Sequence, residues 1–471
     1  MSIAIRAGLL FTVAIWSVMP SAMAQPASDA PPRPSFQPFR YDEDWRSLAE
    51  KSTHIDWLDA LKYIPLGRSN WFATIGGEIR ERFELLDHPG FGSGPTDRNG
   101  YLLQRYLLSS DFHFGAGVRF FGELQSGLEN GRNGGPRPTD LDRVDVHQAF
   151  LDWKVFASDA KAMTIRVGRQ ELGFGSGRLL SPAEGLNLRR SLDGARVTVK
   201  LGKVVWNMTA LRLVKASQNV FDDYPDHAQS MWGTGLTAPH PIWKHANLSL
   251  YYYGLDRKNS VYTKGAGRAI RHTIGSRSWK NTDSWDFNYE AIVQWGSFRG
   301  RPIRAWALSE DTGYTLSKNR LRPRFGIRAD VASGDGGPQS HALGSFDPLL
   351  PAAPVYSGPS GVLGPTNLID LTPTLRISLS QNLSVSWECS SFWRQSLDDG
   401  VYTPFVTPIR AGLSTAGRYV ATAPSITVTW KANRHTTLST TYTRFFAGGY
   451  FDSVPPERNV NYVATWLSYR F

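Results

Sequence analysis

Arginines are concentrated on a stretch near the middle of the chain, on both sides of a glycine-rich segment. Arg166 and Arg169 precede this segment, and Arg178, Arg190 and Arg196 follow it. A guanidinium presents two parallel N–H donors and stays charged at any working pH, so it suits a carboxylate. Several guanidiniums around a wet constriction form a filter for polyanions. The stretch therefore predicts binding and selection of an anionic solute.

The charged residues lie on segments whose side chains alternate between two faces. Between residues 74 and 85, apolar residues alternate with polar ones that include Glu78 and Arg80. A period of two is the pattern of a β-strand with one apolar face. The charged set cannot face lipid, so we expect it to face a lumen. The same division recurs at residues 102–112 and 118–125.

Such segments recur to the end of the chain, separated by clusters of Gly, Asn, Asp and Pro. They predict an all-β fold, a transmembrane antiparallel β-barrel of about eighteen strands. A barrel of that size leaves an aqueous channel. The strands are expected to start near Phe72, Leu102, Val118, Val144, Met163, Ala195, Val204, Met231, Leu248, Ile270, Trp285, Ile303, Phe325, Leu375, Leu383, Val420 and Leu438, with Asn461–Phe471 as the last strand.

The connections between these segments differ in length. Tight connections at residues 115–117, 202–203 and 432–433 are expected to be periplasmic turns, and the long stretches 130–142 and 171–192 extracellular loops. In outer-membrane barrels the periplasmic turns are short and the extracellular loops longer.

One connection does not fit this division. The turn at residues 298–302 is short, yet by this count it falls on the extracellular side. Either that loop is tight, or one strand is miscounted between residues 204 and 283 and a compensating strand is missed near residues 401–410. The second alternative would make residues 334–366 a periplasmic lid instead of an extracellular loop.

The start of the chain reads as an export signal. Residues 1–24 contain a basic residue, an apolar run and an A-x-A sequence, which are features of a cleaved signal peptide. Residues 25–70 are then expected to form a periplasmic extension, with a short amphipathic helix or two within residues 41–61. Residues 71–471 are expected to form the barrel.

The end of the chain supports the same location. The last strand ends on Phe471 with no polar tail. Bacterial outer-membrane barrels end in this way, because the last strand pairs with the first and removes edges that lipid does not tolerate. We expect Phe471 to be read by the barrel-insertion machinery. For this segment alone, an edge strand of a soluble sandwich is the alternative.

Composition narrows the classes of partner. The formal net charge of +11 attracts anions. Export and the scattering of basic residues argue against nucleic acid and favour the inner wall of a pore in the outer membrane of a Gram-negative bacterium. The single cysteine, Cys389, forms no internal disulfide.

Several runs follow one another in an order that identifies a family. They are Arg40-Tyr41-Asp42-Glu43-Asp44, Tyr63-Ile64-Pro65-Leu66-Gly67, Gly76-Gly77-Glu78-Ile79-Arg80, Gly168-Arg169-Gln170-Glu171, Gly175-Ser176-Gly177-Arg178-Leu179, Arg190 with Asp193-Gly194, Arg271 with Thr273, Gly275 and Arg277, Ser333-Gly334-Asp335, Asn367-Leu368 and Phe471. In these runs, across nearly the whole mature chain, the sequence resembles the alginate export family of outer-membrane porins.

The resemblance implies an eighteen-stranded barrel that passes a negatively charged uronate polymer through an arginine-rich constriction. It also implies a periplasmic loop able to occlude the pore. The arginines that it implicates are Arg80, Arg105, Arg119, Arg166, Arg169, Arg178, Arg190, Arg196 and Arg328, with Glu78, Glu123 and Asp330 as counter-charges. Each arginine has an alternative role, a pair with an acid across the wall that stiffens the barrel without selecting solutes.

Other chemistries find little support. An outer-membrane hydrolase needs a nucleophile, a base and an orienting group at one rim, but His113, His147 and His272 lie on separate segments and no Gly-x-Ser-x-Gly elbow follows a strand. Asp140, Asp142 and Asp145 could bind Ca²⁺, but they lack EF-hand spacing. We therefore predict no enzyme, no metal and no cofactor.

Within the channel class the second reading is an anion-selective porin for small acidic solutes such as uronates or organic acids. A basic inner wall would attract both a polyuronate and small acidic solutes. The diameter of the pore and the folding of its loops decide which of them can pass. Expected partners are outer-membrane lipid, the anionic solute and periplasmic secretion proteins. A pore does not pump, so export or uptake depends on a polymerase or a consumer on one side.

Overall fold

The computed structural model describes residues 34–50, 56–337 and 339–471, so the expected signal peptide lies outside it. No helix among these residues is long and apolar enough to cross a bilayer. The helical elements are η1 Arg40–Asp42, η2 Arg46–Ala49, η4 Trp57–Leu61, α1 Pro89–Gly92, α2 Pro354–Ser357, η5 Gly358–Ser360 and α3 Tyr450–Ser453.

The expectation of an amphipathic helix or two within residues 41–61 was wrong in kind. In the described part of this stretch, residues 41–50 and 56–61, the chain forms separate 3-10 turns instead, η1, η2 and η4. Extended backbone at Glu43 and Glu50 interrupts the helical path. The near-helical spacing of the apolar residues reflects burial of single side chains such as Trp45 and Leu48.

The described residues are otherwise dominated by strands. These are β1 Ile64–Pro65, β2 Trp71–Asp87, β3 Asp97–Phe114, β4 Val118–Asn130, β5 Asp142–Ala157, β6 Lys161–Gln170, β7 Leu192–Leu201, β8 Val204–Lys215, β9 Tyr224–Pro239, β10 Asn247–Tyr262, β11 Gly265–Lys280, β12 Trp285–Phe298, β13 Arg301–Thr315, β14 Arg324–Ala332, β15 Leu368–Ser378, β16 Leu383–Arg394, β17 Val401–Tyr402, β18 Pro408–Arg410, β19 Tyr419–Lys431, β20 Thr436–Ala447 and β21 Val460–Arg470.

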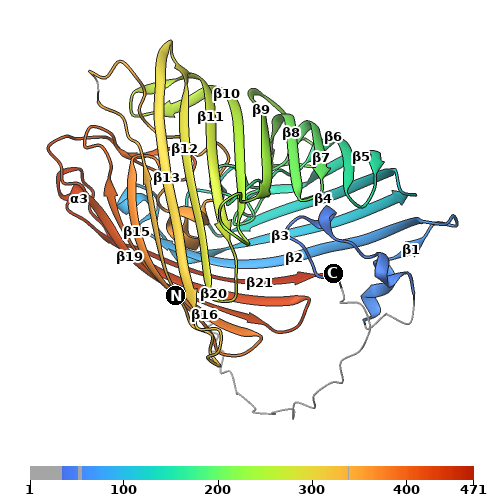
Figure 1. Ribbon diagram of the computed structural model, residues 1–471. Helices are drawn as coiled ribbons and strands as arrows, with labels where there is room; N and C mark the ends of the chain where they lie inside the picture. The colour runs from blue at the N-terminus through green and yellow to red at the C-terminus, as the bar shows by residue number, and fades with distance from the viewer. Residues whose placement is uncertain (1–33, 51–55, 338) are drawn as a thin grey trace, which may run out of the picture.

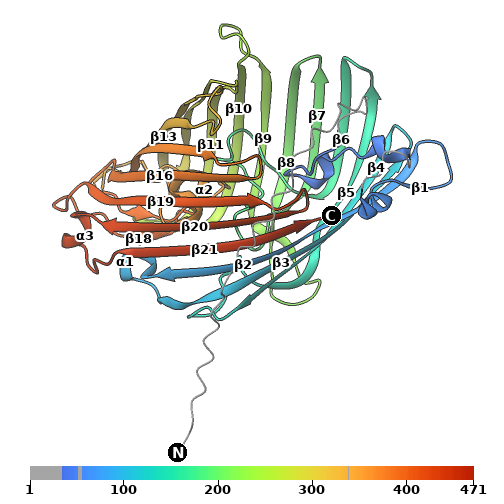
Figure 2. The ribbon, with the colours of Figure 1, turned by 90° about the horizontal axis from the view of Figure 1, so that it is seen from below.

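The strands β2 to β16 and β19 to β21 form a closed antiparallel barrel of 18 strands, as predicted from the sequence (Figure 1). Strand β21 closes it against β2, in a register that runs from Glu78↔Arg470 to Asp87↔Asn461. Figure 2 shows β20, β21, β2 and β3 side by side along this seam. Strand β1 extends the sheet only beside β2, and β17 and β18 form a separate hairpin.

Backbone hydrogen bonds extend the seam to the last residue. The N–H of Phe471 donates to the carbonyl of Gly77 at 3.1 Å, and the N–H of Gly77 donates to the carbonyl of Phe471 at 2.9 Å. A Cβ at position 77 would lie 2.4 Å from the carbonyl oxygen of Leu107 and 2.7 Å from the ring of Phe471. Glycine is therefore the residue that this junction accepts.

The alternation predicted for the wall is present. On β2, Ile79 and Phe83 are exposed on the outer face, whereas Glu78 and Arg80 are buried on the inner face. Outer-face aromatic residues on other strands include Trp206, Trp285, Trp295, Trp387 and Trp430. An apolar outer surface rich in aromatic residues is what a wall in contact with lipid requires.

The two ends of the barrel differ, and we name them for their features. At the terminal end, which holds Phe471, the connections between barrel strands have between two and eight residues, as at 202–203 and 316–323. At the loop end lie the long connections 171–191 and 333–367, together with two-residue turns such as 299–300. The turn near residue 300 is therefore a tight connection at the loop end. The predicted number of eighteen strands was right, and residues 334–366 belong to the loop end.

Candidate functional site

Two long connections from the loop end join to each other inside the barrel, and we call residues 171–191 and 333–367 the internal loops. The N–H of Leu350 donates to the carbonyl of Leu179 at 2.9 Å, and the N–H of Ser181 donates to the carbonyl of Leu350 at 2.9 Å. The Tyr356 hydroxyl donates to the carbonyl of Arg178 at 2.7 Å. The two loops therefore act as one body.

The N-terminal segment contacts the inner face of the wall from the other end. Arg40 donates to Glu78 at 2.9 Å and lies 3.5 Å from Glu123. The ring of Tyr41 makes edge contacts with Phe121 and Phe150. Strands β2 to β6, the internal loops and the N-terminal segment thus share one layer of side chains inside the barrel.

Three of the predicted arginines pair with acids on this part of the wall. Arg105 is fully buried and donates to Glu78 at 2.6 Å. Arg119 donates twice to Asp111, at 2.7 and 2.6 Å. Arg166 donates twice to Asp152, at 2.7 and 2.9 Å.

The acids of these pairs are part of the wall itself. Asp111 lies on β3 and Asp152 on β5. Asp152 also lies 3.8 Å from Arg119, so it links this arginine to Arg166. The guanidiniums of Arg119 and Arg166 are thus held by acids of the wall.

A second group of predicted charges meets where the internal loops approach β14. Arg178 donates to Asp330 at 3.1 Å. Arg328 lies 3.9 Å from the same carboxylate and 3.7 Å from Glu388 on β16. Asp330 is therefore shared by Arg178, from an internal loop, and Arg328, from the wall.

Of the remaining predicted arginines, Arg80 lies beside Arg105, since both donate to the carbonyl of Glu184, and the other three lie elsewhere. Arg169 pairs with Asp193 at 2.9 Å. Arg80 donates to the carbonyls of Glu184 and Leu186 on an internal loop. Arg190 donates to the carbonyls of Ser181 and Leu350, and Arg196 donates to the Asn207 side chain at 2.9 Å. Among the described residues, neither Arg190 nor Arg196 pairs with a carboxylate.

A cavity of about 620 Å³ lies on the inner side of β2, β20 and β21, and we call it the basic cavity. Arg80, Arg82, Lys431, Arg434 and Arg470 line it, whereas Glu184 is the single acid among its lining residues. The indole of Trp466 forms part of the same surface.

Acidic partners of the basic cavity lie behind its lining. Glu78 accepts from Arg470 at 3.0 Å and is almost fully buried, whereas the Arg470 side chain keeps 31% of its surface exposed. Arg434 is 34% exposed and contacts Asp56. Arg434 and Arg470 therefore keep part of their surface exposed, and so does Glu184, whose side chain is 46% exposed. The five lining cations outnumber this one lining acid, so the cavity presents net positive charge.

A second, smaller cavity of about 310 Å³ opens at the loop end, separate from the basic cavity. Arg190 and Arg257 line it together with residues such as Gln229 and Asn259. Burial and the neighbouring Arg257 lower the pKa of Arg190 to about 10, so it stays protonated at neutral pH. The internal loops, which supply Arg190 here and Glu184 to the basic cavity, lie between these two spaces.

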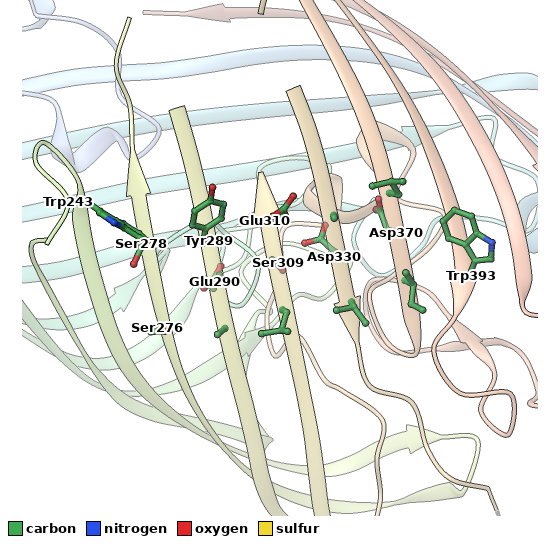
Figure 3. A pocket seen from close by; sticks show the side chains of 16 residues that line it. Trp243, Ser276, Ser278, Tyr289, Glu290, Ser309, Glu310, Asp330, Asp370 and Trp393 are labelled. Atoms are coloured by element: carbon green, nitrogen blue, oxygen red, sulfur yellow. The ribbon is translucent and has the colours of Figure 1, made fainter. Parts of the chain in front are cut away.

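A third hollow does not belong to the lumen. It measures about 690 Å³ and spreads over strands β11 to β15 between Trp243 and Trp393 (Figure 3). Leu308 and Leu371, which help to line it, are exposed on the outer face of the wall. This hollow therefore faces the surroundings of the barrel.

The family profile described as Alginate export matches residues 72–464, which is most of the chain. The chain belongs to the alginate export family. The resemblance inferred from the motifs is thereby confirmed. No curated protein matches the sequence of this alginate export family member.

Solved structures of outer-membrane porins share its fold. OccD3 (OpdP) of Pseudomonas aeruginosa is 10% identical with a TM-score of 0.58, over 87% of this chain and 93% of that one. OpdK of the same organism, solved with vanillate, is 11% identical with a TM-score of 0.54, over 85% and 98%. OccK2 (OpdF) of P. aeruginosa, solved with glucuronate, is 10% identical with a TM-score of 0.53, over 85% and 96%. At these identities the likeness concerns the fold.

Sequence reasoning missed most of the lining of the basic cavity in this alginate export family member. Of the nine predicted arginines, only Arg80 lines it. Arg82 and Arg470 carried a usable signal, because their parity places them on the inner face of β2 and β21. Lys431 and Arg434 stand at a tight turn, and their direction depends on the N-terminal segment that contacts that turn.

Proposed function

We propose that the protein is an outer-membrane channel that passes a negatively charged polysaccharide, an alginate-like polyuronate. The observation that carries the proposal is the basic cavity, in which five cations face one acid. Membership of the alginate export family supports the substrate class. The protein has no catalytic role in this proposal.

The chemistry of the basic cavity suits a uronate residue. Arg470 and Arg434 are partly exposed and fixed from behind by acids, so they can present donors to a carboxylate without first leaving a partner. Trp466 offers an aromatic face whose negative charge density attracts the polarised C–H groups of a sugar ring. One side of a uronate would meet charge and the other an apolar surface.

A second candidate is a porin for small acidic solutes. The internal loops are joined inside the lumen by main-chain hydrogen bonds, and a small anion needs less room beside them than a polymer does. Vanillate and glucuronate, named with the similarly folded OpdK and OccK2, are small carboxylates. Both candidates use the same basic cavity.

The outer face of the wall supports a location in the outer membrane of a Gram-negative bacterium. Its apolar and aromatic side chains would contact lipid. In this orientation the terminal end faces the periplasm and the loop end faces outward. The barrel-insertion machinery would then meet Phe471 from the periplasm, where secretion proteins could also dock.

Planar-bilayer recordings test both candidates. Under a salt gradient we expect a reversal potential that indicates anion preference. Mannuronate oligomers of increasing length should block the current, whereas neutral dextran oligomers of the same lengths should not. Block that strengthens up to long oligomers supports the polymer, and block by monomers alone supports the porin for small solutes. A non-selective current that no uronate blocks would refute both.

Paired variants assign this selectivity to the basic cavity. Lys431→Gln combined with Arg470→Gln should shift the reversal potential toward zero and weaken uronate block by about tenfold, since two charges are removed. Arg268→Gln is the matched control, because Arg268 pairs with Asp256 on an exposed part of the loop end. An equal effect in the control would show that the basic cavity does not determine the anion selectivity.

A further inference from the structure

Three aspartates from two separate parts of the chain converge at the loop end, and a fourth, Asp142, lies near enough to feel their charge. Asp142 and Asp145 belong to the start of β5, and Asp222 and Asp223 immediately precede β9. The N–H of Phe221 donates to the carbonyl of Val144 at 3.0 Å, which holds the second segment against the first.

Three of these carboxylates converge closely. Asp145, Asp222 and Asp223 each offer one oxygen, and these oxygens all lie within 4.8 Å of one another. Oxygens bound to one Ca²⁺ at 2.3–2.6 Å are at most about 5 Å apart. The convergence therefore matches the coordination sphere of a single ion.

Hydrogen bonds orient these side chains. The N–H of Asp223 donates to Asp145 Oδ2 at 2.8 Å, and the N–H of Ser217 donates to Asp223 Oδ1 at 2.7 Å. Asn219 donates to Asp222 Oδ2 at 2.9 Å. The other oxygen of Asp222 is buried and has no hydrogen-bond partner among the described residues.

Asp142 supplies an independent indication of a missing ligand. It is fully buried, and neither of its carboxylate oxygens has a hydrogen-bond partner in the described part of the chain. The charged groups that act on it are Asp145, Asp222 and Asp223, which are all acidic. A buried carboxylate is costly unless it is paired with a cation.

The neighbouring cation does not balance this charge. Arg169 approaches Asp145 only to 3.6 Å and donates mainly to Asp193. Four carboxylates thus share part of one guanidinium. A divalent cation would offset two of these four negative charges.

We propose that Asp145, Asp222 and Asp223, beside the buried carboxylate of Asp142, bind a divalent cation of the Ca²⁺ type, which fixes residues 216–223 to β5 at the loop end. The ligands are carboxylate oxygens, as hard cations prefer, and the cluster contains no nitrogen or sulfur ligand of the kind that zinc or copper selects. The site is distinct from the basic cavity and does not depend on the proposed function.

The sequence pointed only to the local half of this cluster. Its candidate set was Asp140, Asp142 and Asp145, which lacks EF-hand spacing and led to the prediction of no metal. Asp140 instead accepts from Arg137 at 2.9 Å. The partners that complete the site lie about 80 residues further along the chain.

Calcium titration of the full chain in detergent tests the proposal. After treatment with a chelator and removal of the chelator, isothermal titration with CaCl₂ should give about one ion per chain. The midpoint of thermal unfolding should rise with the calcium concentration, because the ion binds only the folded state. Mg²⁺ should bind more weakly, since it demands a smaller octahedral site.

Two substitutions locate the ion. Asp142→Asn and Asp223→Asn each keep the shape of the side chain and should weaken Ca²⁺ binding by about tenfold or more, since Asp223→Asn removes a charged ligand and Asp142→Asn removes a buried negative charge beside the site. Asp226→Asn is the matched control, because Asp226 lies nearby on β9 and bonds only to its local neighbours Ala228 and Gln229.

The proposal is overturned if the native chain binds no Ca²⁺, or if both variants bind it as the native chain does. If a variant does not fold, the titration of the native chain with and without chelator still decides the matter.

Discussion

At the scale of single residues, exposure separates the charges that hold the wall from those that a solute can meet. Arg105 is completely buried, whereas Arg470 keeps 31% of its side chain exposed, and both contact Glu78. Removing one member of a buried ion pair typically costs about 3–5 kcal/mol, because the other charge is left uncompensated. Exposed pairs contribute about 0–1 kcal/mol.

Glu78 is the residue at which this difference is largest. It accepts from Arg40, Arg105 and Arg470 at once. Glu78→Gln should lower the free energy of unfolding by about 3–5 kcal/mol. Urea unfolding of the refolded protein in detergent measures this loss.

A neighbouring position provides the control. Glu81→Gln changes a carboxylate on the outer parity of the same strand, which accepts from the Tyr106 hydroxyl at 2.9 Å. Its effect should stay below about 1 kcal/mol. Equal effects at the two positions would mean that Glu78 does not organise the inner layer.

Lys62, between η4 and β1, gives the N-terminal segment a pH dependence. Burial lowers the pKa of its amine from 10.5 to about 8, and its Nζ has no hydrogen-bond partner among the described residues. Between these two pKa values the unfolded chain binds more protons than the folded chain, so stability should rise as the pH is raised from about 8 to 10.5.

Lys62→Met isolates this contribution. The variant should be more stable than the native chain by about 3 kcal/mol at pH 7, because folding no longer buries a charge, and the difference should vanish near pH 10.5. Unfolding curves of both proteins at several pH values measure it. The Lys62 ammonium also lies 4.9 Å from the centre of the Trp45 ring. A variant that is less stable at pH 7 would show that this cation–π contact outweighs the cost of burying the charge.

At the scale of elements, the strands were readable from the sequence and the interior was not. Successive side chains of a strand point to opposite faces, as Glu78 and Ile79 do, or Leu108 and Ser109. This alternation can therefore be predicted from the sequence without knowing the fold. The inward folding of the internal loops depends on contacts between residues such as Leu179 and Leu350, far apart in sequence. No local pattern records that contact.

The same limit applies to the candidate site. Motifs singled out Arg105, Arg119 and Arg166, but whether an arginine meets an acid or a solute depends on which residue lies opposite it in the barrel. Asp111 and Asp152 provide those partners for Arg119 and Arg166. The sequence alone could not assign the roles of these charges, because the residues opposite them are set by the closed barrel.

The joined internal loops make a prediction about conductance. Replacement of residues 336–362 by a short turn should raise single-channel conductance by about a factor of two or more, because an 18-stranded barrel without interior loops leaves a wide aqueous channel. Shortening of the terminal-end turn 316–323 is the control and should leave conductance unchanged. Equal conductance in the two deletion variants would show that the internal loops do not form the narrowest part of the channel.

At the scale of the whole molecule, closure of the sheet is the decisive event, because an open edge is not tolerated in lipid. The sequence predicted this closure from the alternation in the last strand and from the terminal Phe471. The structure adds that Gly77 is the residue on which the chain end closes.

Two substitutions separate recognition of the chain end from closure itself. Phe471→Ala keeps the main-chain hydrogen bonds to Gly77, so detergent refolding should be unchanged while the folded barrel in cell membranes decreases several-fold. Gly77→Val should impair both, because its Cβ would lie 2.4 Å from the carbonyl oxygen of Leu107. Heat-modifiable migration on gels measures both. Normal assembly of Phe471→Ala in cells would refute a role in recognition.

The seam at Gly77 also decides where a reporter group can be attached. A tag fused after Phe471 would carry the chain past the backbone pair that ends the sheet, into the space beside Lys62, which lies close to Gly76. The turn 316–323 leaves the barrel at the same end, and its residues Lys318, Asn319 and Arg320 are exposed. Fluorophores and affinity handles for the recordings described above therefore belong in that turn.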